Sequence, residues 1–189
     1  FIGSDAGRYA SDPFSVSGVL DVNVFAAHDS FFAGTNSGYQ ATHAKNSSFI
    51  GTNSGYAATD AESSNFIGFG SGQNAYNANN SNFIGSNSGT AAENARNASF
   101  VGTFAGAYAT NAFYSNFMGS SAGIGATNAN DSVFIGTIAG SGAVDANNSN
   151  FIGKSAGNNA DNAANSIFIG QYAGNNDVVD NRSGGASIL

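Results

Sequence analysis

A phenylalanine recurs every 17 residues along most of this 189-residue chain. Such a strict period indicates that the same side chain occupies the same place in each repeat, and that each repeat buries its apolar face on its neighbours. We therefore expect one stack of repeats instead of several independent domains. Nine phenylalanines keep the spacing with no insertion or deletion between them: Phe32, Phe49, Phe66, Phe83, Phe100, Phe117, Phe134, Phe151 and Phe168.

The repeat unit reads F-I-G-x-x-(A/S)-G-x-x-A-x-x-A-x-x-S-x, where the positions marked x are mostly Asn, Ser, Thr or Tyr. Two glycines per unit disfavour a helix, since each costs about 1 kcal/mol in a helix interior. Antiparallel hairpins are also disfavoured, because no Asn or Asp is followed by Gly, which is the strongest signal for a two-residue hairpin turn. Seventeen residues are too few for a helix pair or a propeller blade, but they suit one coil of a β-solenoid.

The sequence therefore predicts an all-β fold, a β-solenoid or β-roll of 17-residue coils that forms a single domain over residues 1–189. About ten coils at about 4.8 Å per coil would make a rod of about 48 Å. We expect this rod to pack against other copies of itself.

Two columns of apolar side chains follow from this fold, because successive side chains of a strand point to opposite faces. The phenylalanines would form a core ladder, and the residues that follow them would lie outside and contact another chain in a two-fold or three-fold bundle. Alternatively, a bend at the glycine turns both residues inward. The predicted inter-chain ladder, called the apolar ladder below, consists of Ile50, Ile67, Ile84, Val101, Met118, Ile135, Ile152 and Ile169.

The repeat is interrupted at residues 11–25, because the first coil carries an insertion. Apolar and polar residues alternate there, as in an extended strand with one apolar face. This segment is either a flap that caps the stack or an assembly strand donated to a neighbouring subunit. Its apolar residues are Phe14, Val16, Leu20, Val22 and Val24.

A C-terminal cap is expected at residues 175–189. Asp177 and Asp180 stand there in place of two alanines of the repeat. Charges in a column of small side chains would block the addition of another coil.

Charge and composition bear on the partners of the chain. The net charge is −7, and the five basic residues form no stripe that could neutralise phosphates, so nucleic acid is not expected as a partner. No run approaches the roughly 18 apolar residues of a membrane span, so no membrane partner is expected. The chain has no cysteine, which excludes disulfides and thiolate metal sites.

Catalytic chemistry has little to build on. His28 beside Asp29, and His43, are the only imidazoles. The acidic residues share no single repeat position, so neither a paired-carboxylate site nor a calcium array is supported. We expect no enzyme activity, no cofactor and no metal. Ice binding remains a remote alternative, because Thr52, Thr103 and Thr137 share a repeat position that other residue types interrupt.

Two kinds of side chain are candidates for surface roles. Tyr39, Tyr56, Tyr76 and Tyr108 stand at variable positions, where aromatic rings on a polar surface could stack on sugars. The number of N-x-S/T acceptors is close to what the Asn, Ser and Thr content alone predicts. These candidate glycosylation sites are Asn46, Asn79, Asn97, Asn130, Asn147 and Asn181.

The units at residues 82–89 and 149–157, N-F-I-G-S-N-S-G and S-N-F-I-G-K-S-A-G, resemble the S-x-A-I-G-x-x-A repeats in the head of trimeric autotransporter adhesins. They are also similar to the N-T-A-I-G-type repeats of bacteriophage tail fibres. The resemblance implies a trimeric β-roll that extends a fibre or binds a host surface. In this chain Phe replaces the small or β-branched residue of those repeats, and the second Gly is an addition.

Together these features predict a non-catalytic structural subunit or segment of an extracellular fibre or filament, on a cell surface or a virion, whose partners are other copies of itself. The alternative is an adhesin or phage tail-fibre module that binds host surface glycans.

Overall fold

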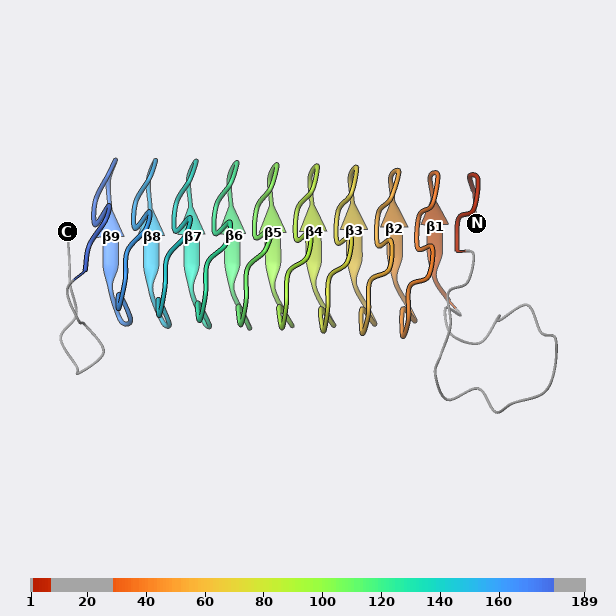
Figure 1. Ribbon diagram of the computed structural model, residues 1–189, viewed down its shortest axis with the longest axis horizontal. Coiled ribbons are helices and arrows are strands. Elements are labelled where there is room, and N and C mark those ends of the chain that lie inside the picture. Colours follow the sequence, from red (N-terminus) through yellow and green to blue (C-terminus); the bar gives the residue numbers. More distant parts are fainter. Residues whose placement is uncertain (1, 8–28, 179–189) are drawn as a thin grey trace.

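The computed structural model describes residues 2–7 and 29–178, which form a single stack of coils (Figure 1). Nine strands of three residues each lie side by side in one parallel sheet, in chain order from β1 to β9. The strands are β1 (Phe31–Ala33), β2 (Ser48–Ile50), β3 (Asn65–Ile67), β4 (Asn82–Ile84), β5 (Ser99–Val101), β6 (Asn116–Met118), β7 (Val133–Ile135), β8 (Asn150–Ile152) and β9 (Ile167–Ile169).

Each strand pairs with the next at an offset of one repeat. Phe66 lies opposite Phe83, and Phe83 lies opposite Phe100. The prediction that residues 17 apart lie directly over one another is therefore confirmed, and the described part of the chain is an all-β parallel solenoid without a helix.

The predicted number of coils, about ten, is wrong. Nine strands bound eight complete turns, which at about 4.8 Å each make a rod of about 38 Å. The prediction counted the two ends as full coils. Residues 2–7 add only part of one, in which Ile2 pairs with Ala33 and the Gly7 N–H donates to the Ser37 carbonyl at 2.7 Å.

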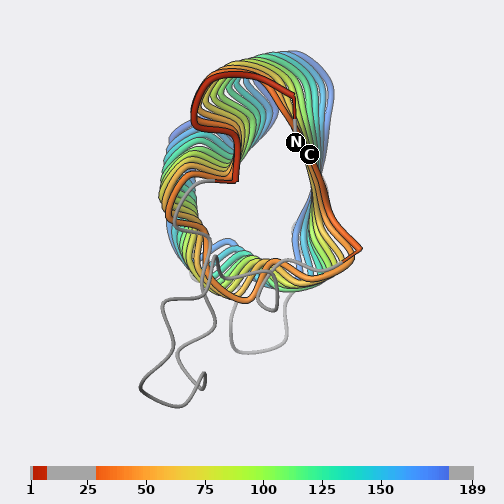
Figure 2. The same ribbon diagram turned by 90° about the vertical axis from the view of Figure 1, so that its right-hand side faces the viewer.

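The interior is filled by a stack of aromatic rings. The nine phenylalanines of the repeat are fully buried, and the ring centroids of neighbours such as Phe66 and Phe83 lie 4.8 Å apart. Seen along the axis, successive coils lie nearly over one another, with a gradual displacement along the stack (Figure 2). Buried Ala and Ser side chains occupy the rest of the interior. Burial of one such ring is worth about 1.5–3 kcal/mol, and its stacking adds about 0.5–1.5 kcal/mol.

Both glycines of the repeat are required by close approach. Gly85 has a φ of 132°, and a Cβ there would lie 2.6 Å from the carbonyl oxygen of Gly102 in the next coil. Gly89 has a φ of 62°, and a Cβ there would lie 2.2 Å from the ring of Phe83. The core ring thus packs directly against the second glycine of its own coil.

The corners of each coil explain the abundance of asparagine. Within residues 2–7 and 29–178, 33 non-glycine residues have positive φ, and 16 of them are Asn and 5 are Asp. These two residue types tolerate the left-handed conformation better than other side chains, because their short polar groups can bond locally. Much of the Asn content is therefore a requirement of the backbone.

Buried serines join the coils by hydrogen bonds. The Ser81 hydroxyl donates to the Ala95 carbonyl at 2.6 Å and accepts from the Ala98 N–H at 3.1 Å. Each such bond contributes about 0.5–1.5 kcal/mol. The same repeat position holds Ser30, Ser47, Ser64, Ser81, Ser115, Ser132, Ser149 and Ser166, which we call the serine ladder, and Ala98 interrupts it once.

The structure describes only part of the segments where the repeat is predicted to break. The insertion at 11–25, with the proposed assembly strand, lies outside the described residues, and of the C-terminal cap only residues 175–178 lie inside them. Asp177 stands one repeat after the buried Ala160, and its carbonyl accepts a hydrogen bond from the Asp161 N–H at 2.7 Å.

Candidate functional site

The apolar ladder lies on the outer face of the sheet. Ile50 and Ile67 are each 37% exposed, and Met118 is 45% exposed. In every strand from β2 to β9 the Phe is buried while the residue after it is exposed or half-buried. The alternative in which both residues turn inward is therefore wrong, because the chain keeps strand geometry until the glycine.

Polar side chains border the apolar ladder on one side. The residue before each Phe shares the outer face of the sheet, and this position is Asn or Ser in most coils. The Asn65 amide donates to the Asn82 side-chain oxygen at 2.9 Å, so part of this border is linked along the axis. The result is a narrow apolar stripe that repeats at the strand spacing and is widened where Phe31, Val133 and Ile167 take the bordering position.

A second column of side chains runs along the solenoid at the repeat position of Asn94. The Asn77 amide donates to Asn94 at 2.8 Å, and Asn94 donates to Asn111 at 3.0 Å. The series continues through Asn128 to Asp145, with distances of 2.9 and 2.7 Å. These amides hold the coils together, and they bond to one another in the folded chain.

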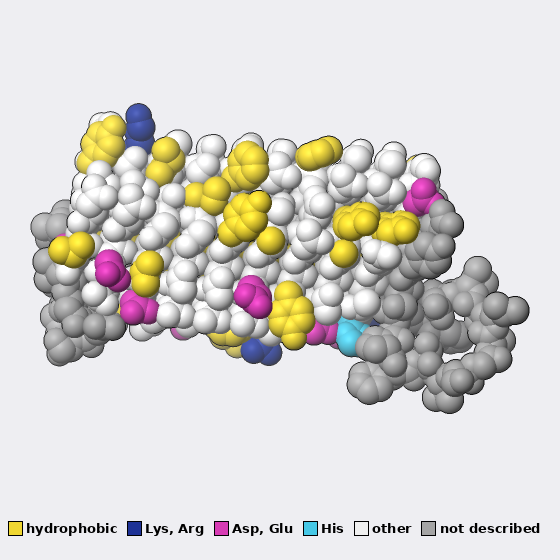
Figure 3. Space-filling view, in the orientation of Figure 1, with side chains coloured by type: hydrophobic (Ala, Val, Ile, Leu, Met, Phe, Trp, Pro, Cys, Tyr) yellow, Lys and Arg dark blue, Asp and Glu magenta, His cyan; other side chains and the backbone are white. Residues whose placement is uncertain are grey.

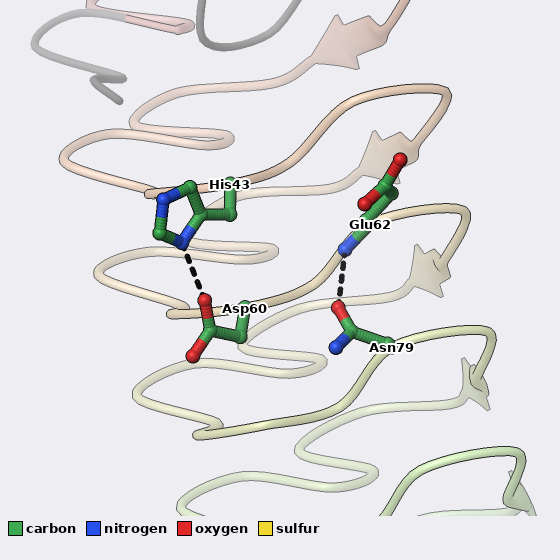
Figure 4. Close-up of polar contacts among 4 residues, drawn as sticks. All are labelled: His43, Asp60, Glu62 and Asn79. Atoms are coloured by element: carbon green, nitrogen blue, oxygen red, sulfur yellow. Dashed lines mark hydrogen bonds and ion pairs between the residues drawn. The ribbon is translucent and has the colours of Figure 1, made fainter. Parts of the chain in front are cut away.

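The only described imidazole belongs to this same column. His43 pairs with Asp60 of the next coil, and nearby the Glu62 N–H donates to the Asn79 side-chain oxygen at 3.0 Å (Figure 4). Within residues 2–7 and 29–178, no group of three or more His, Cys, Asp or Glu side chains comes together to hold a metal ion. His28 lies outside the described residues.

The candidate glycosylation sites differ in their surroundings. Asn46 and Asn97 are exposed, whereas the side-chain oxygens of Asn79, Asn130 and Asn147 accept hydrogen bonds from the backbone of the preceding coil. Asn181 lies outside the described residues.

The candidate tyrosines do not form one surface. Tyr39 and Tyr56 stack on each other with ring centroids 5.2 Å apart, while Tyr76 and Tyr108 are 48% and 60% exposed at two other repeat positions. The face in Figure 3 is largely white, with scattered hydrophobic side chains, some of them in contact with each other, and few charges. Aromatic side chains therefore dot a polar surface.

A groove that the sequence analysis did not single out crosses four consecutive coils. Its volume is about 570 Å³. A usable signal was present in the sequence, because two adjacent aromatic residues replace the polar residues of other coils at these repeat positions. The groove is lined by Asn79, Asn80, Arg96, Asn97, Phe113, Tyr114, Asn130 and Asp131.

Comparisons with known proteins identify no family. No protein-family description matches the chain, and no curated protein sequence matches it significantly. In the part of the chain that the structure describes, no helix has the length and apolar character needed to cross a membrane.

Proposed function

We propose that this chain is a non-catalytic structural segment of an extracellular fibre or filament, on a cell surface or a virion, in which copies associate side by side. The observation that carries the proposal is the apolar ladder, a column of eight apolar side chains at one repeat position on the outside of the coil, whereas the other exposed apolar residues are spread over several repeat positions. Exposed apolar patches of this extent on a soluble protein usually mark contact surfaces.

A second copy of the chain is the partner that fits this surface best. An identical ladder has the same spacing along the axis, so its side chains can meet those of the first ladder along the whole length. A closed two-fold or three-fold arrangement would bury all ladders at once, because symmetric oligomers place the same patch of each subunit in the interface. The resemblance to fibre repeats favours three-fold packing.

The border of the ladder supports the same assignment. Interfaces commonly combine an apolar centre with a polar rim, and here the Asn and Ser column before each Phe would form that rim. The net charge of −7 is spread over the whole chain, so a bundle would need few like charges at its centre.

The oligomeric state in solution tests the proposal. Light scattering after size exclusion is expected to give two or three times the chain mass of 18.9 kDa. A variant with Ile84→Lys and Ile135→Lys should be monomeric, because burial of two ammonium groups in the interface is costly. Electron microscopy then distinguishes long filaments from short discrete bundles.

The matched control carries Tyr76→Lys and Val144→Lys. These residues are 48% and 39% exposed, lie outside the apolar ladder and change the net charge equally. The control should keep the mass of the wild type. A monomeric wild type at about 100 µM, or a ladder variant that still assembles, would contradict the proposal.

A further inference from the structure

The groove is built from pairs of consecutive residues that recur one coil apart. Residues 79–80, 96–97, 113–114 and 130–131 each contribute a pair, so the groove runs along the axis of the solenoid. These repeat positions precede those of the apolar ladder by four to five residues, and no ladder residue lines the groove. The groove therefore offers a second surface, whose use does not depend on the proposed association of copies.

Its aromatic pair is not explained by the fold. Phe113 and Tyr114 are the only aromatic residues at these two repeat positions, where the described coils otherwise carry Asn, Asp, Ser, Ala or a single Lys, Glu or Arg. Tyr114 is 62% exposed and has a φ of 57°, a conformation that is strained for a bulky side chain. Tyr108 is strained and exposed in the same way, so these two properties alone do not mark Tyr114. What sets Tyr114 apart is its place in the groove, next to Phe113 and Arg96, and this placement points to a function.

The polar groups of the groove are open to a ligand. The Arg96 guanidinium stacks on the Phe113 ring at 5.0 Å from its centroid, and this contact orients it. Among the described residues, it has no ion-pair or hydrogen-bond partner, and the side-chain amides of Asn80 and Asn97 have no hydrogen-bond partner. The amides of the Asn94 column, by contrast, bond to one another.

The charges of the groove nearly balance. Arg96 supplies one positive charge, and Asp131, at the repeat position of Tyr114 in the next coil, supplies one negative charge. The Asp131 carboxylate would repel a phosphate or polyanion, and the Arg96 guanidinium would repel a polycation. A neutral ligand rich in hydroxyl groups avoids both repulsions, and its hydroxyls can donate to Asp131 and accept from Arg96 and the amides.

We propose that this groove binds a neutral oligosaccharide. The apolar face of one sugar ring packs on Tyr114, and the ring hydroxyls bond to Asn80, Asn97 and the two charged groups. A concave site that combines an aromatic platform with a few unpartnered polar groups suits such a ligand, since a sugar ring has one apolar face and a polar edge. The volume of about 570 Å³ accommodates more than one sugar unit.

Binding is tested with a panel of neutral hexasaccharides, made of glucose or N-acetylglucosamine units in different linkages, by titration calorimetry and saturation-transfer NMR. At least one is expected to bind with a Kd below about 1 mM. Sialyllactose and a hyaluronan hexasaccharide form the anionic arm, and both should bind more weakly.

The decisive variant is Tyr114→Asn, which restores the residue found at this repeat position in five other coils and should therefore fold. It is expected to weaken binding at least about tenfold. The matched control is Tyr108→Asn in the same coil. Tyr108 is 60% exposed, has a φ of 59°, and likewise has Asn at its repeat position in other coils, but it lies outside the groove.

Three results would overturn the proposal: no neutral hexasaccharide binding at about 10 mM, equal losses in the two tyrosine variants, or tighter binding of the anionic arm. The Ile84→Lys, Ile135→Lys variant should retain sugar binding. Sugar binding by this monomeric variant would show that the groove acts independently of the association of copies.

Discussion

Replacement of Ala98 by serine should stabilise the protein. Ala98 is 1% exposed and interrupts the serine ladder, so two backbone groups of the next coil lose the hydroxyl that serves their equivalents elsewhere. Among the described residues, the Ser115 N–H donates no hydrogen bond, and the Ala112 carbonyl accepts none. In the preceding coil Ser81 serves both roles, at 3.1 and 2.6 Å.

The magnitude follows from the cost of those groups. A buried polar group without a partner costs about 1–3 kcal/mol, and a new hydroxyl at position 98 would satisfy one donor and one acceptor. Burial of the hydroxyl itself offsets part of this gain, because a polar group leaves water. Because the other coils place serine on the same backbone, Ala98→Ser needs no rearrangement. We expect the free energy of unfolding to rise by about 1–3 kcal/mol.

Urea unfolding followed by circular dichroism measures the total effect, and hydrogen exchange measures the local one. The Ser115 amide should exchange about tenfold more slowly in Ala98→Ser than in the wild type. The reciprocal variant, Ser132→Ala, removes a donor to the Ala146 carbonyl at 2.6 Å and an acceptor for the next serine, and should cost a similar amount. If Ser132→Ala destabilises but Ala98→Ser does not stabilise, the reasoning about the gap is refuted.

Three further substitutions test other features of the coil by urea unfolding. Gly89→Ala should destabilise by about 2–5 kcal/mol, since it combines left-handed strain with a clash against the Phe83 ring. Ile138→Asn should stabilise by about 1 kcal/mol, because Ile138 is a β-branched residue at a φ of 65° where other coils carry Asn. Phe117→Ala should cost about 3–5 kcal/mol by opening a cavity in the ring stack.

Each of these has an outcome that would count against it. A neutral Gly89→Ala variant would mean that the core ring does not approach the backbone as closely as described. A destabilised Ile138→Asn variant would mean that the side chain packs more than it strains the corner. Phe117→Ala would be at odds with a shared core if it unfolded no more easily than the wild type.

The stacked coil could be predicted because the period leaves few alternatives. Nine phenylalanines at constant spacing can lie over one another only if every coil has the same length, and parallel pairing follows. The number of coils was harder to predict from the sequence. The period does not say whether the residues before Phe32 and after Phe168 complete a turn, and eight turns lie between the strands.

The role of asparagine illustrates what composition hides. A polar residue at a variable position is usually interpreted as solvated surface. Asn94, however, adopts a left-handed backbone conformation and makes hydrogen bonds to the coils on both sides. Apart from the invariant second glycine, the left-handed positions leave little periodic mark, because Asn, Asp, Gly and other residues alternate there. The groove could not be predicted for a different reason. A repeat pattern predicts only the features that all coils share, whereas the groove depends on Phe113 and Tyr114, which depart from the pattern.

The constant offset between paired strands makes this protein a molecular ruler. Every 17 residues advance the axis by one strand spacing, close to the 4.8 Å that separates neighbouring Phe rings. Duplication or loss of one unit would therefore change the reach of the molecule in equal increments while leaving each face in line. Evolution could set the length of such an arm by counting units, without redesigning either its interior or its surface.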